Sequence, residues 1–395
     1  MLLIITGVCV SDEHMEWSEF VMFVIEQVVQ DKDYSIFERF EEVSHHGIQP
    51  PASRQGVMCS KNLSELNRLF VGVGPDLLIF NSSAQSPTWL TDADKLVLQH
   101  KSKKATQGLN AFPSLKEEKS AVTTGKVADD VAYNCLDLAY LPSKDILFVL
   151  RSDLCIEFHR FSSRTSFLPE NMEHFGFWNL TSPHYRIQIR DIPDEPWRLL
   201  IIGNTSEIES WLITVGERGH IEISDPQLLS AHTDFVRDIL IIYNVQYSLL
   251  ASASMDKKVI LWDLKTLTYK STKMGHSAGV QCLAYDGKST LFAGGFDYSI
   301  IGWDLDAQIS KPIIVLNGHM GTVMKMRAIG SHDRCISLDV NGIIQFWDTS
   351  RANPNDEERQ IAQLSCLEDH IRSIEVLIPS IFTLITDSLI SMSAM

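Results

Sequence analysis

The stretch 275–304 reads GHSAGVQCLAYDGKSTLFAGGFDYSIIGWD, so it begins with Gly-His and ends with Trp-Asp. The same pattern recurs at 231–263, AHTDFVRDILIIYNVQYSLLASASMDKKVILWD, and at 318–348, GHMGTVMKMRAIGSHDRCISLDVNGIIQFWD. A further start, DHIRSIEVL, occupies 369–377. The histidines and tryptophans return every 41 to 51 residues, a spacing that no single helix or strand sets. Such a period indicates a structural repeat.

Each unit has the interior of an antiparallel sheet. A β-branched residue stands four positions after each histidine, and short apolar runs such as LLASAS and LFAGGF follow, separated by turn residues. Four such strands fit in each unit. One four-stranded sheet cannot cover both of its own faces, whereas sheets arranged radially around an axis cover one another. The repeat therefore predicts an all-β propeller.

Three weaker units precede the strong ones, and in them the apolar rhythm survives without the Gly-His and Trp-Asp pairs. They are 57–81, 131–160 and 196–225. Phe80 and Phe158 stand where the first two would carry tryptophan, and the third ends in IEISD. With the units from 231, 275, 318 and 369, the count predicts a seven-bladed propeller.

The final unit is expected to be incomplete, because HIRSIEVL and FTLITDSLI supply about two strands and only SMSAM follows. The segment 55–60, QGVMCS, could be lent to it but is too short to replace two strands. We therefore expect the chain to be part of a longer protein and to behave better when extended. The predicted division is a helical segment at 1–50 and a propeller at 51–395, with a flexible insertion at 101–130.

From 231 to 350 the sequence resembles the WD-repeat family of β-propellers. In that family a His, a Ser or Thr on the second strand, an Asp in the next turn and a Trp form a buried hydrogen-bonded chain. The donors and acceptors of these side chains suit such a chain. The resemblance implies these roles for His232, Ser254, Asp256 and Trp262.

The next two units depart from the family pattern. The second unit has His276, Asp297 and Trp303, but Gly295 stands where Ser254 does, so its network is expected to lack a link or to use water. The third unit has His319, Ser337 and Trp347, with either Asp339 or Asn341 in the acidic place. We expect these groups to be structural rather than catalytic, because they would lie between strands and outside any reachable pocket.

The N-terminal segment SDEHMEWSEFVMFVIEQVVQDKD has the apolar spacing of an amphipathic helix. Its EWSEF stretch also resembles the end of an EF-hand loop, and some WD-repeat proteins carry EF-hands before their propellers. If Glu19 is the last loop position, Val8 and Val10 fall on ligand positions and Glu13 replaces the turn glycine. Calcium needs several oxygen ligands around a sharp turn. We therefore expect neither calcium binding nor any other metal site in this chain.

The composition narrows the class of partner. The formal net charge of −16 argues against nucleic acid and against anionic membranes. The seven cysteines contain no CxxC pair, which favours reduced thiols in a reducing compartment. No apolar run is long enough for a membrane span and no signal-peptide pattern is present, so a cytoplasmic location is expected.

The sequence contains no GxSxG, HExxH or P-loop, and the resemblance implies binding rather than catalysis. We therefore predict a non-enzymatic scaffold without a cofactor, which binds other proteins on the loop face of the propeller. The alternative is a calcium-responsive adaptor in which EF-hands regulate the propeller. EF-hand-bearing relatives point by analogy to a cilium or flagellum. The expected contact residues are Asp234, Phe235, Arg237, Lys257, Gln281, Tyr298 and Met324.

Overall fold

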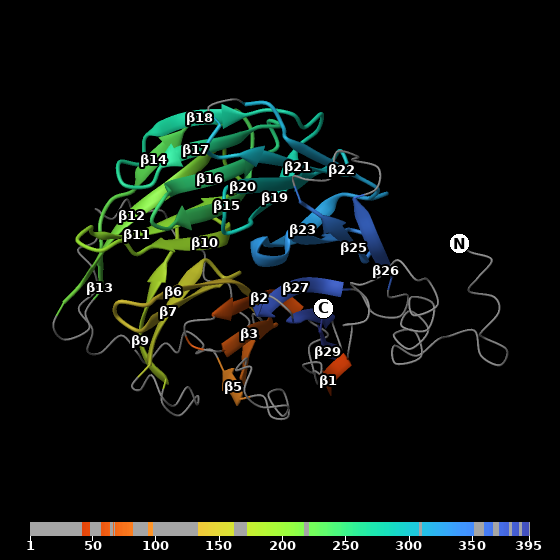
Figure 1. The fold of residues 1–395 in the computed structure, drawn as a ribbon. Coiled ribbons are helices and arrows are strands. Elements are labelled where there is room, and N and C mark those ends of the chain that lie inside the picture. Colours follow the sequence, from red (N-terminus) through yellow and green to blue (C-terminus); the bar gives the residue numbers. More distant parts are fainter. Residues whose placement is uncertain are drawn as a thin grey trace, which may run out of the picture.

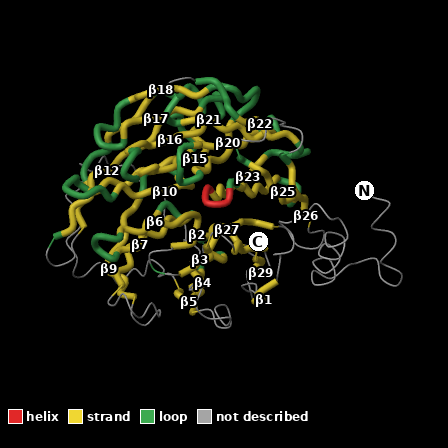
Figure 2. The backbone as a smooth tube through the Cα atoms, viewed as in Figure 1, coloured by secondary structure: helices red, strands yellow, loops and turns green. Residues whose placement is uncertain are grey.

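The computed structural model describes residues 42–47, 57–63, 66, 68–81, 94–97, 133–161, 172–216, 221–307, 310–350, 359–365, 371–378, 381–386 and 389–394. Antiparallel sheets of these residues are arranged around a central axis (Figure 1), which gives the all-β propeller architecture that the repeat predicts. Within the described ranges the one helical element is a short 3-10 helix, η3 (Gly330–His332), near the middle of the view in Figure 2.

Six sheets of the described part are each built from consecutive strands. The first contains β2 (Val57–Leu63), β3 (Arg68–Val73), β4 (Asp76–Asn81) and β5 (Asp94–Val97). The second contains β6 (Cys135–Leu141), β7 (Ile146–Arg151), β8 (Cys155–Phe161) and β9 (Met172–Asn179). The third contains β10 (His184–Arg190), β11 (Trp197–Gly203) and β12 (Glu207–Val215), with β13 (Ile221–Ile223) and β14 (Gln227–Ser230) both paired to β12.

The remaining three of these sheets correspond to the strong repeats. The fourth contains β15 (Val236–Tyr243), β16 (Ser248–Ser254), β17 (Val259–Asp263) and β18 (Tyr269–Lys273). The fifth contains β19 (Val280–Tyr285), β20 (Thr290–Gly295), β21 (Ser299–Asp304) and β22 (Ile314–Asn317). The sixth contains β23 (Val323–Ile329), β24 (Arg334–Asp339), β25 (Ile343–Asp348) and β26 (Gln360–Ser365).

One further sheet is composite. It joins β27 (Ile371–Ile378), β28 (Ile381–Thr386) and β29 (Leu389–Ala394) to β1 (Glu42–Gly47), in the order β1-β29-β28-β27. The prediction of seven units in tandem is therefore wrong in its connectivity, because six sheets are continuous in the described chain and this one is not. The expectation of only about two strands in the last unit is also wrong.

Backbone pairing explains both errors. A strand is held in a sheet by its N–H and C=O groups, so stretches such as EVSHHG and LISMSA can pair although they carry few strand-favouring residues. β1 pairs with β29 from Glu42 opposite Ser393 to Gly47 opposite Leu389. Residues 57–60 of the segment that could have been lent belong to β2 instead.

The N-terminal domain prediction is corrected in part. Residues 42–47 of the predicted helical segment form a strand. The amphipathic pattern and the EF-hand resemblance before residue 42 lie outside the described residues, as does the predicted insertion at 101–130.

The first strand of each continuous sheet, and β27 of the composite sheet, faces the axis and contacts its counterpart in the next sheet. The contacts run β2, β6, β10, β15, β19, β23, β27 and back to β2. Each of these strands has a register shift near its start, as between Val236 and Asp238 in β15. The carboxylate after this bulge accepts the N–H of the next sheet: Leu283 N lies 2.9 Å from Asp238 Oδ2. In β6, Asp137 Oδ2 accepts the N–H of Ile187 in the same way at 3.0 Å.

The strand register also corrects two of the weaker units. Trp262 lies opposite Leu250, and Phe80 lies opposite Leu69 in the same manner, as expected. In the second sheet, however, His159 and not Phe158 occupies this place, opposite Leu147.

In the third sheet the third strand is β12, which carries Trp211 opposite Leu199. The IEI of IEISD forms β13 instead. The error arose because the last apolar run before residue 225 was assigned to the third strand, whereas β12 precedes it and alternates polar and apolar residues.

The composite sheet gives the first testable prediction. Replacing His45 and His46 together by proline removes two adjacent backbone donors, at least one of which faces β29 because neighbouring N–H groups of a strand point in opposite directions. We expect the free energy of unfolding in urea to fall by about 1–3 kcal/mol. The double alanine variant keeps both donors and should stay near the wild type. Equal stability of the two variants would show that β1 does not hold the ring closed.

Candidate functional site: buried polar networks and the loops they support

The fourth sheet contains a complete polar chain that starts at the loop before β15 and ends on β17. Asp256 Oδ2 lies 2.9 Å from Nδ1 of His232, and the other ring nitrogen lies 2.8 Å from Oγ of Ser252. Trp262 donates its indole N–H to the same Oγ at 2.8 Å. The chain therefore links the loop, the second strand and the third strand of one sheet.

The serine of this chain is Ser252, not the predicted Ser254. Both serines are buried and, being two residues apart, both point to the same face of β16. Only Ser252 lies level with the His and Trp side chains. Ser254 instead donates to the carbonyl of Asp234 at 2.9 Å and accepts the N–H of Asp256 at 3.1 Å, so it shapes the turn.

The pKa shifts follow from this burial. Burial lowers the pKa of His232 below its ordinary value, against the opposing effect of Asp256. The ring is therefore neutral at pH 7, with Nδ1–H donating to Asp256 and Nε2 accepting from Ser252. Burial by itself raises the pKa of Asp256, but hydrogen bonds from His232 and the N–H of Thr233 outweigh it and hold that pKa below its ordinary value.

The fifth sheet lacks one link, as the sequence predicted, but the missing serine is at a different position. Ala293 pairs with Ile301 as Ser252 pairs with Ile260, so Ala293 and not Gly295 is the equivalent residue. His276 Nδ1 lies 3.0 Å from Asp297, while its Nε2 is buried without a hydrogen-bond partner. Trp303 donates instead to the carbonyl of Met274 at 3.1 Å.

The sixth sheet settles the choice between Asp339 and Asn341. Asp339 Oδ2 lies 3.3 Å from Nδ1 of His319, and its Oδ1 accepts the backbone N–H of Asn341 at 2.9 Å. Ser337 Oγ lies 2.6 Å from His319 Nε2 and accepts the Trp347 indole N–H at 2.7 Å. The chain is complete, although its carboxylate comes from the end of β24 and not from the turn.

The second and third sheets use other groups, which sequence reasoning missed. In the second sheet Glu157 is hydrogen-bonded both to Arg151 and, at 3.0 Å, to Nε2 of His159, all three being almost fully buried. In the third sheet His184 lies 3.2 Å from Glu209, which accepts the Trp211 indole N–H at 3.0 Å. The signal was available in Trp211, which stands at the repeat position of Trp262.

Four of the residues predicted to bind a partner lie in loops and turns over these networks, and the other three lie at the starts of β15, β19 and β23. Phe235 and Tyr298 are 46% and 47% exposed, and Asp234 and Lys257 are also exposed. Tyr298 has a positive φ of 63°, in the tight turn after β20.

The other predicted contact residues are less available. Arg237 is partly buried, donates from Nε to Gln281 Oε1 at 2.9 Å and lies over the ring of Tyr185. Met324 is also partly buried. These three side chains are therefore less accessible to a partner than Phe235 and Tyr298.

Three further exposed apolar side chains belong to the same loops. Met320 is 84% exposed, Val340 is 61% exposed and Phe296 is 37% exposed. A sequence signal existed for two of them, because Phe296 and Val340 both come directly after the second strand, where the fourth sheet has Met255. We call Phe235, Phe296, Tyr298, Met320 and Val340 the loop arc.

The loop arc lies at one end of the ring. In each sheet the start of the first strand pairs with the end of the second, as Val236 pairs with Ser254. The loop before the first strand and the turn after the second therefore meet at the same end. A backbone hydrogen bond joins them in each of the three sheets, for example Met255 N to Phe235 O at 2.9 Å.

The described residues contain no group of three or more His, Cys, Asp or Glu side chains placed to hold a metal ion. No helix among them has the length and apolar character needed to span a membrane.

The networks predict unequal effects of two histidine substitutions. His232→Ala leaves the buried Ser252 and Asp256 without their histidine partner, whereas His276 bonds only to Asp297. We expect His232→Ala to lower the free energy of unfolding by about 1 kcal/mol more than His276→Ala. The measurement is urea unfolding of both variants under the same conditions, with equal denaturant slopes. Equal losses would contradict the difference between the two networks.

The missing link can also be restored. Ala293→Ser places a hydroxyl where Ser252 has one, so it should satisfy Nε2 of His276 and leave stability unchanged or raised by up to about 1 kcal/mol. The matched control is Ala251→Ser, which buries a hydroxyl in an apolar cluster and should cost about 1–3 kcal/mol. A similar loss for both variants, measured by the same unfolding assay, would show that Ala293 is not the missing link.

Comparisons with known proteins agree with this geometry. The family model described as "WD domain, G-beta repeat" matches residues 225–263 and 267–304. In the structural comparison, the WD40 β-propeller domain of Doa1 superposes with a TM-score of 0.57 at 13% identity, covering 90% of this chain and 97% of that one.

Two curated relatives are similar over part of their length. The chain is 21% identical over 351 residues to "Cilia- and flagella-associated protein 337 B" of Tetrahymena thermophila, covering 85% of this chain and 27% of that protein. It is 27% identical over 107 residues to "Actin-interacting protein 1-2" of Arabidopsis thaliana, covering 27% of this chain and 17% of that protein. The chain thus spans a minor part of either relative. Residues 225–263 and 267–304 therefore match WD40 repeats, and the chain has the fold of a WD40 β-propeller.

Proposed function

We propose that this chain is a non-enzymatic scaffold that binds other proteins through the loop arc. The observation that carries the proposal is the exposure of five apolar side chains on loops of three consecutive sheets. Aromatic residues and methionine are favoured at protein interfaces, and a cluster of exposed apolar side chains on a folded surface is typical of an interaction site.

The buried networks support this role by fixing the loops. Asp256 Oδ2 bonds to His232 and also accepts the backbone N–H of Thr233 at 3.1 Å, so the loop that carries Phe235 is tied to the turn that carries Lys257. In the next sheet Asp297 accepts the N–H of Ser277 at 2.8 Å. A surface held in one conformation before binding loses less conformational entropy when a partner docks.

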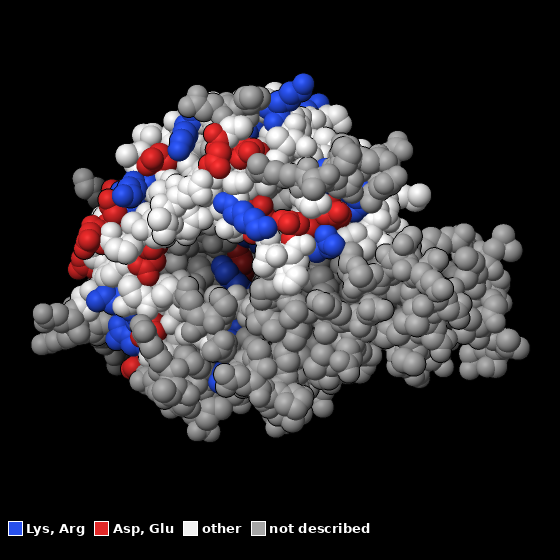
Figure 3. Space-filling view, in the orientation of Figure 1, with Lys and Arg blue, Asp and Glu red and all other residues white. Residues whose placement is uncertain are grey.

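The charges favour a protein over a polyanion as the partner. In the view of Figure 3, basic and acidic side chains are interspersed over the described sheets, without a continuous basic field. Together with the net charge of −16, this supports a protein partner and not nucleic acid. The absence of a catalytic role is supported by the histidines and aspartates of the networks, which are buried and bonded to one another.

We further propose that the composite sheet acts as the seventh blade. β27 contacts β23 and β24 on one side and β2 on the other, which supports its place in the ring. A location in the cytoplasm, including that of a cilium, is also proposed, the latter because one relative is named as cilia- and flagella-associated.

Affinity capture from extracts of ciliated cells, followed by quantitative mass spectrometry, tests the proposed surface. The double variant Phe235→Ala with Tyr298→Ala should lose at least tenfold of the partner signal, about 1.4 kcal/mol of binding free energy. Because both side chains are about half exposed, the variant should keep the melting temperature of the wild type.

The matched control lies at the opposite end of the same sheet. Tyr243, the last residue of β15, and Val245, in the connection to β16, are exposed to a similar or greater extent. Their double alanine variant should capture the same proteins as the wild type. Loss of partners only in this control variant would move the interface to the other end of the ring.

A further inference from the structure

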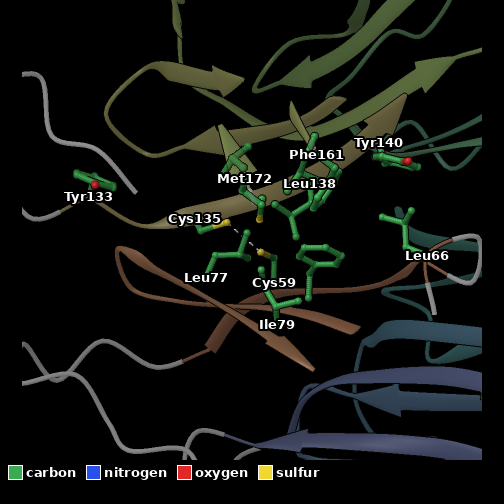
Figure 4. Close-up of a cluster of buried hydrophobic side chains, with 13 residues drawn as sticks. Cys59, Leu66, Leu77, Ile79, Tyr133, Cys135, Leu138, Tyr140, Phe161 and Met172 are labelled. Carbon is green, nitrogen blue, oxygen red and sulfur yellow. Dashed lines mark hydrogen bonds between the residues drawn. The ribbon is translucent and has the colours of Figure 1, made fainter. Parts of the chain in front are cut away.

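Two thiols meet between the first and second sheets. Cys59 of β2 and Cys135 of β6 are 76 residues apart in the chain, yet their sulfur atoms lie 3.4 Å apart. Both side chains are buried, and Figure 4 shows them pointing at each other among apolar side chains that include Leu77 and Leu138. The two sulfurs are therefore in van der Waals contact across the joint between two sheets.

The β-bulges of the first strands bring these thiols together. Cys59 follows the bulge of β2, and Cys135 precedes the bulge of β6. The joint between the fifth and sixth sheets has the same arrangement, with Cys282 in the place of Cys59 and Val323 in the place of Cys135. Cys282 Sγ lies 3.4 Å from the carbonyl oxygen of Val323. The joint geometry thus recurs, and the β2–β6 joint supplies a thiol from both sides.

A glycine makes the space that the sulfurs fill. Gly72 lies opposite Cys59 on β3, and a Cβ there would come within 2.7 Å of the Cys59 sulfur and 3.0 Å of the Cys135 sulfur. Gly294 makes the corresponding space for Val323 in the other joint. Packing of the backbone therefore holds the two sulfurs in contact.

We propose that Cys59 and Cys135 form a reversible disulfide, which covalently joins the first two sheets of the propeller when the protein meets a peroxide oxidant. The Cys59 sulfur attacks one peroxide oxygen, giving a sulfenic acid and one water. The Cys135 sulfur then attacks the Cys59 sulfur and the sulfenic hydroxyl leaves with the thiol proton as a second water. The overall change is two thiols and hydrogen peroxide to one disulfide and two waters. The sulfurs must approach by roughly 1.4 Å to reach the bond length of about 2.05 Å.

The environment sets the order of these steps and their rate. Contact with the Cys59 thiol, together with burial, raises the pKa of Cys135 well above its ordinary value. Cys135 therefore stays a thiol, and the oxidant reacts first with Cys59, which retains a small exposed area. Because the thiolate is the reactive form, oxidation is slow and is gated by brief opening of the β2–β6 joint.

The test is peroxide treatment of the folded chain, followed by blocking of the remaining thiols with N-ethylmaleimide and mass spectrometry without reduction. We expect a cross-linked pair of peptides containing Cys59 and Cys135, lighter by two hydrogens than the separate peptides and cleaved by dithiothreitol. The oxidised protein should melt about 2 °C or more above the reduced protein, since the bond closes a long loop.

Two variants separate this joint from general thiol oxidation. Cys135→Val copies the joint between Cys282 and Val323, so it should fold and should lose both the cross-link and the change in melting temperature. Cys282→Ala should keep both. Cys59 and Cys135 recovered as maleimide adducts or as over-oxidised acids, without a cross-link, would overturn the proposal. So would a cross-link that forms only after the chain is unfolded.

Discussion

The fourth sheet of this protein has two apolar faces, and neither can be covered within the sheet. Leu250 and Trp262 of the fourth sheet pack against Ile202 and Ile208 of the third, while Leu249 and Leu261 pack against side chains of the fifth. Burial of such side chains contributes about 1.5–3 kcal/mol each. A sheet that lost one neighbour would expose these side chains to water and lose that contribution. A ring gives a sheet two neighbours, and at two of the joints an axial carboxylate, Asp137 or Asp238, accepts a backbone N–H of the next sheet.

The polar networks add to this packing. The sheets differ in which groups form hydrogen bonds with the histidine and the tryptophan. Where a serine is present, one hydroxyl serves both the histidine and the tryptophan. Where Ala293 replaces it, the tryptophan finds a backbone carbonyl and one histidine nitrogen has no partner. In the second sheet an arginine, a glutamate and a histidine occupy the space instead. The ring depends on the apolar contacts, and the networks determine how firmly each pair of loops is held.

The repeat was predictable from the sequence because its spacing and apolar rhythm are set by sheet geometry. The partners of individual polar side chains were less predictable. Ser252 and Ser254 are chemically identical and share a face of β16, so only the register with β17 decides which one meets Trp262. The choice between Phe158 and His159 for the tryptophan position also depends on register. The apolar character of Phe158 favours it, although His159 occupies the position. The composite sheet was missed since β1 is mostly polar and lies far from β29 in the chain, and their pairing depends on backbone groups that every residue carries. The networks in the second and third sheets use residue types that the repeat pattern does not contain. They could have been found only from the repeat positions that their residues occupy.

The pairing of β1 with β29 also affects the order in which the parts of the protein fold. During synthesis β1 leaves the ribosome before any other described strand, and β29 leaves last, so the first strand made must wait for its partner. The six continuous sheets can form from local contacts in the meantime, whereas joining Gly47 to Leu389 requires closure of a loop almost as long as the chain. The entropic cost of that closure falls sharply once the intervening sheets have folded, because they bring the two ends together. Until then β2 and β27 each lack a neighbour, and the nascent protein carries two open edges that a chaperone or a second chain can occupy.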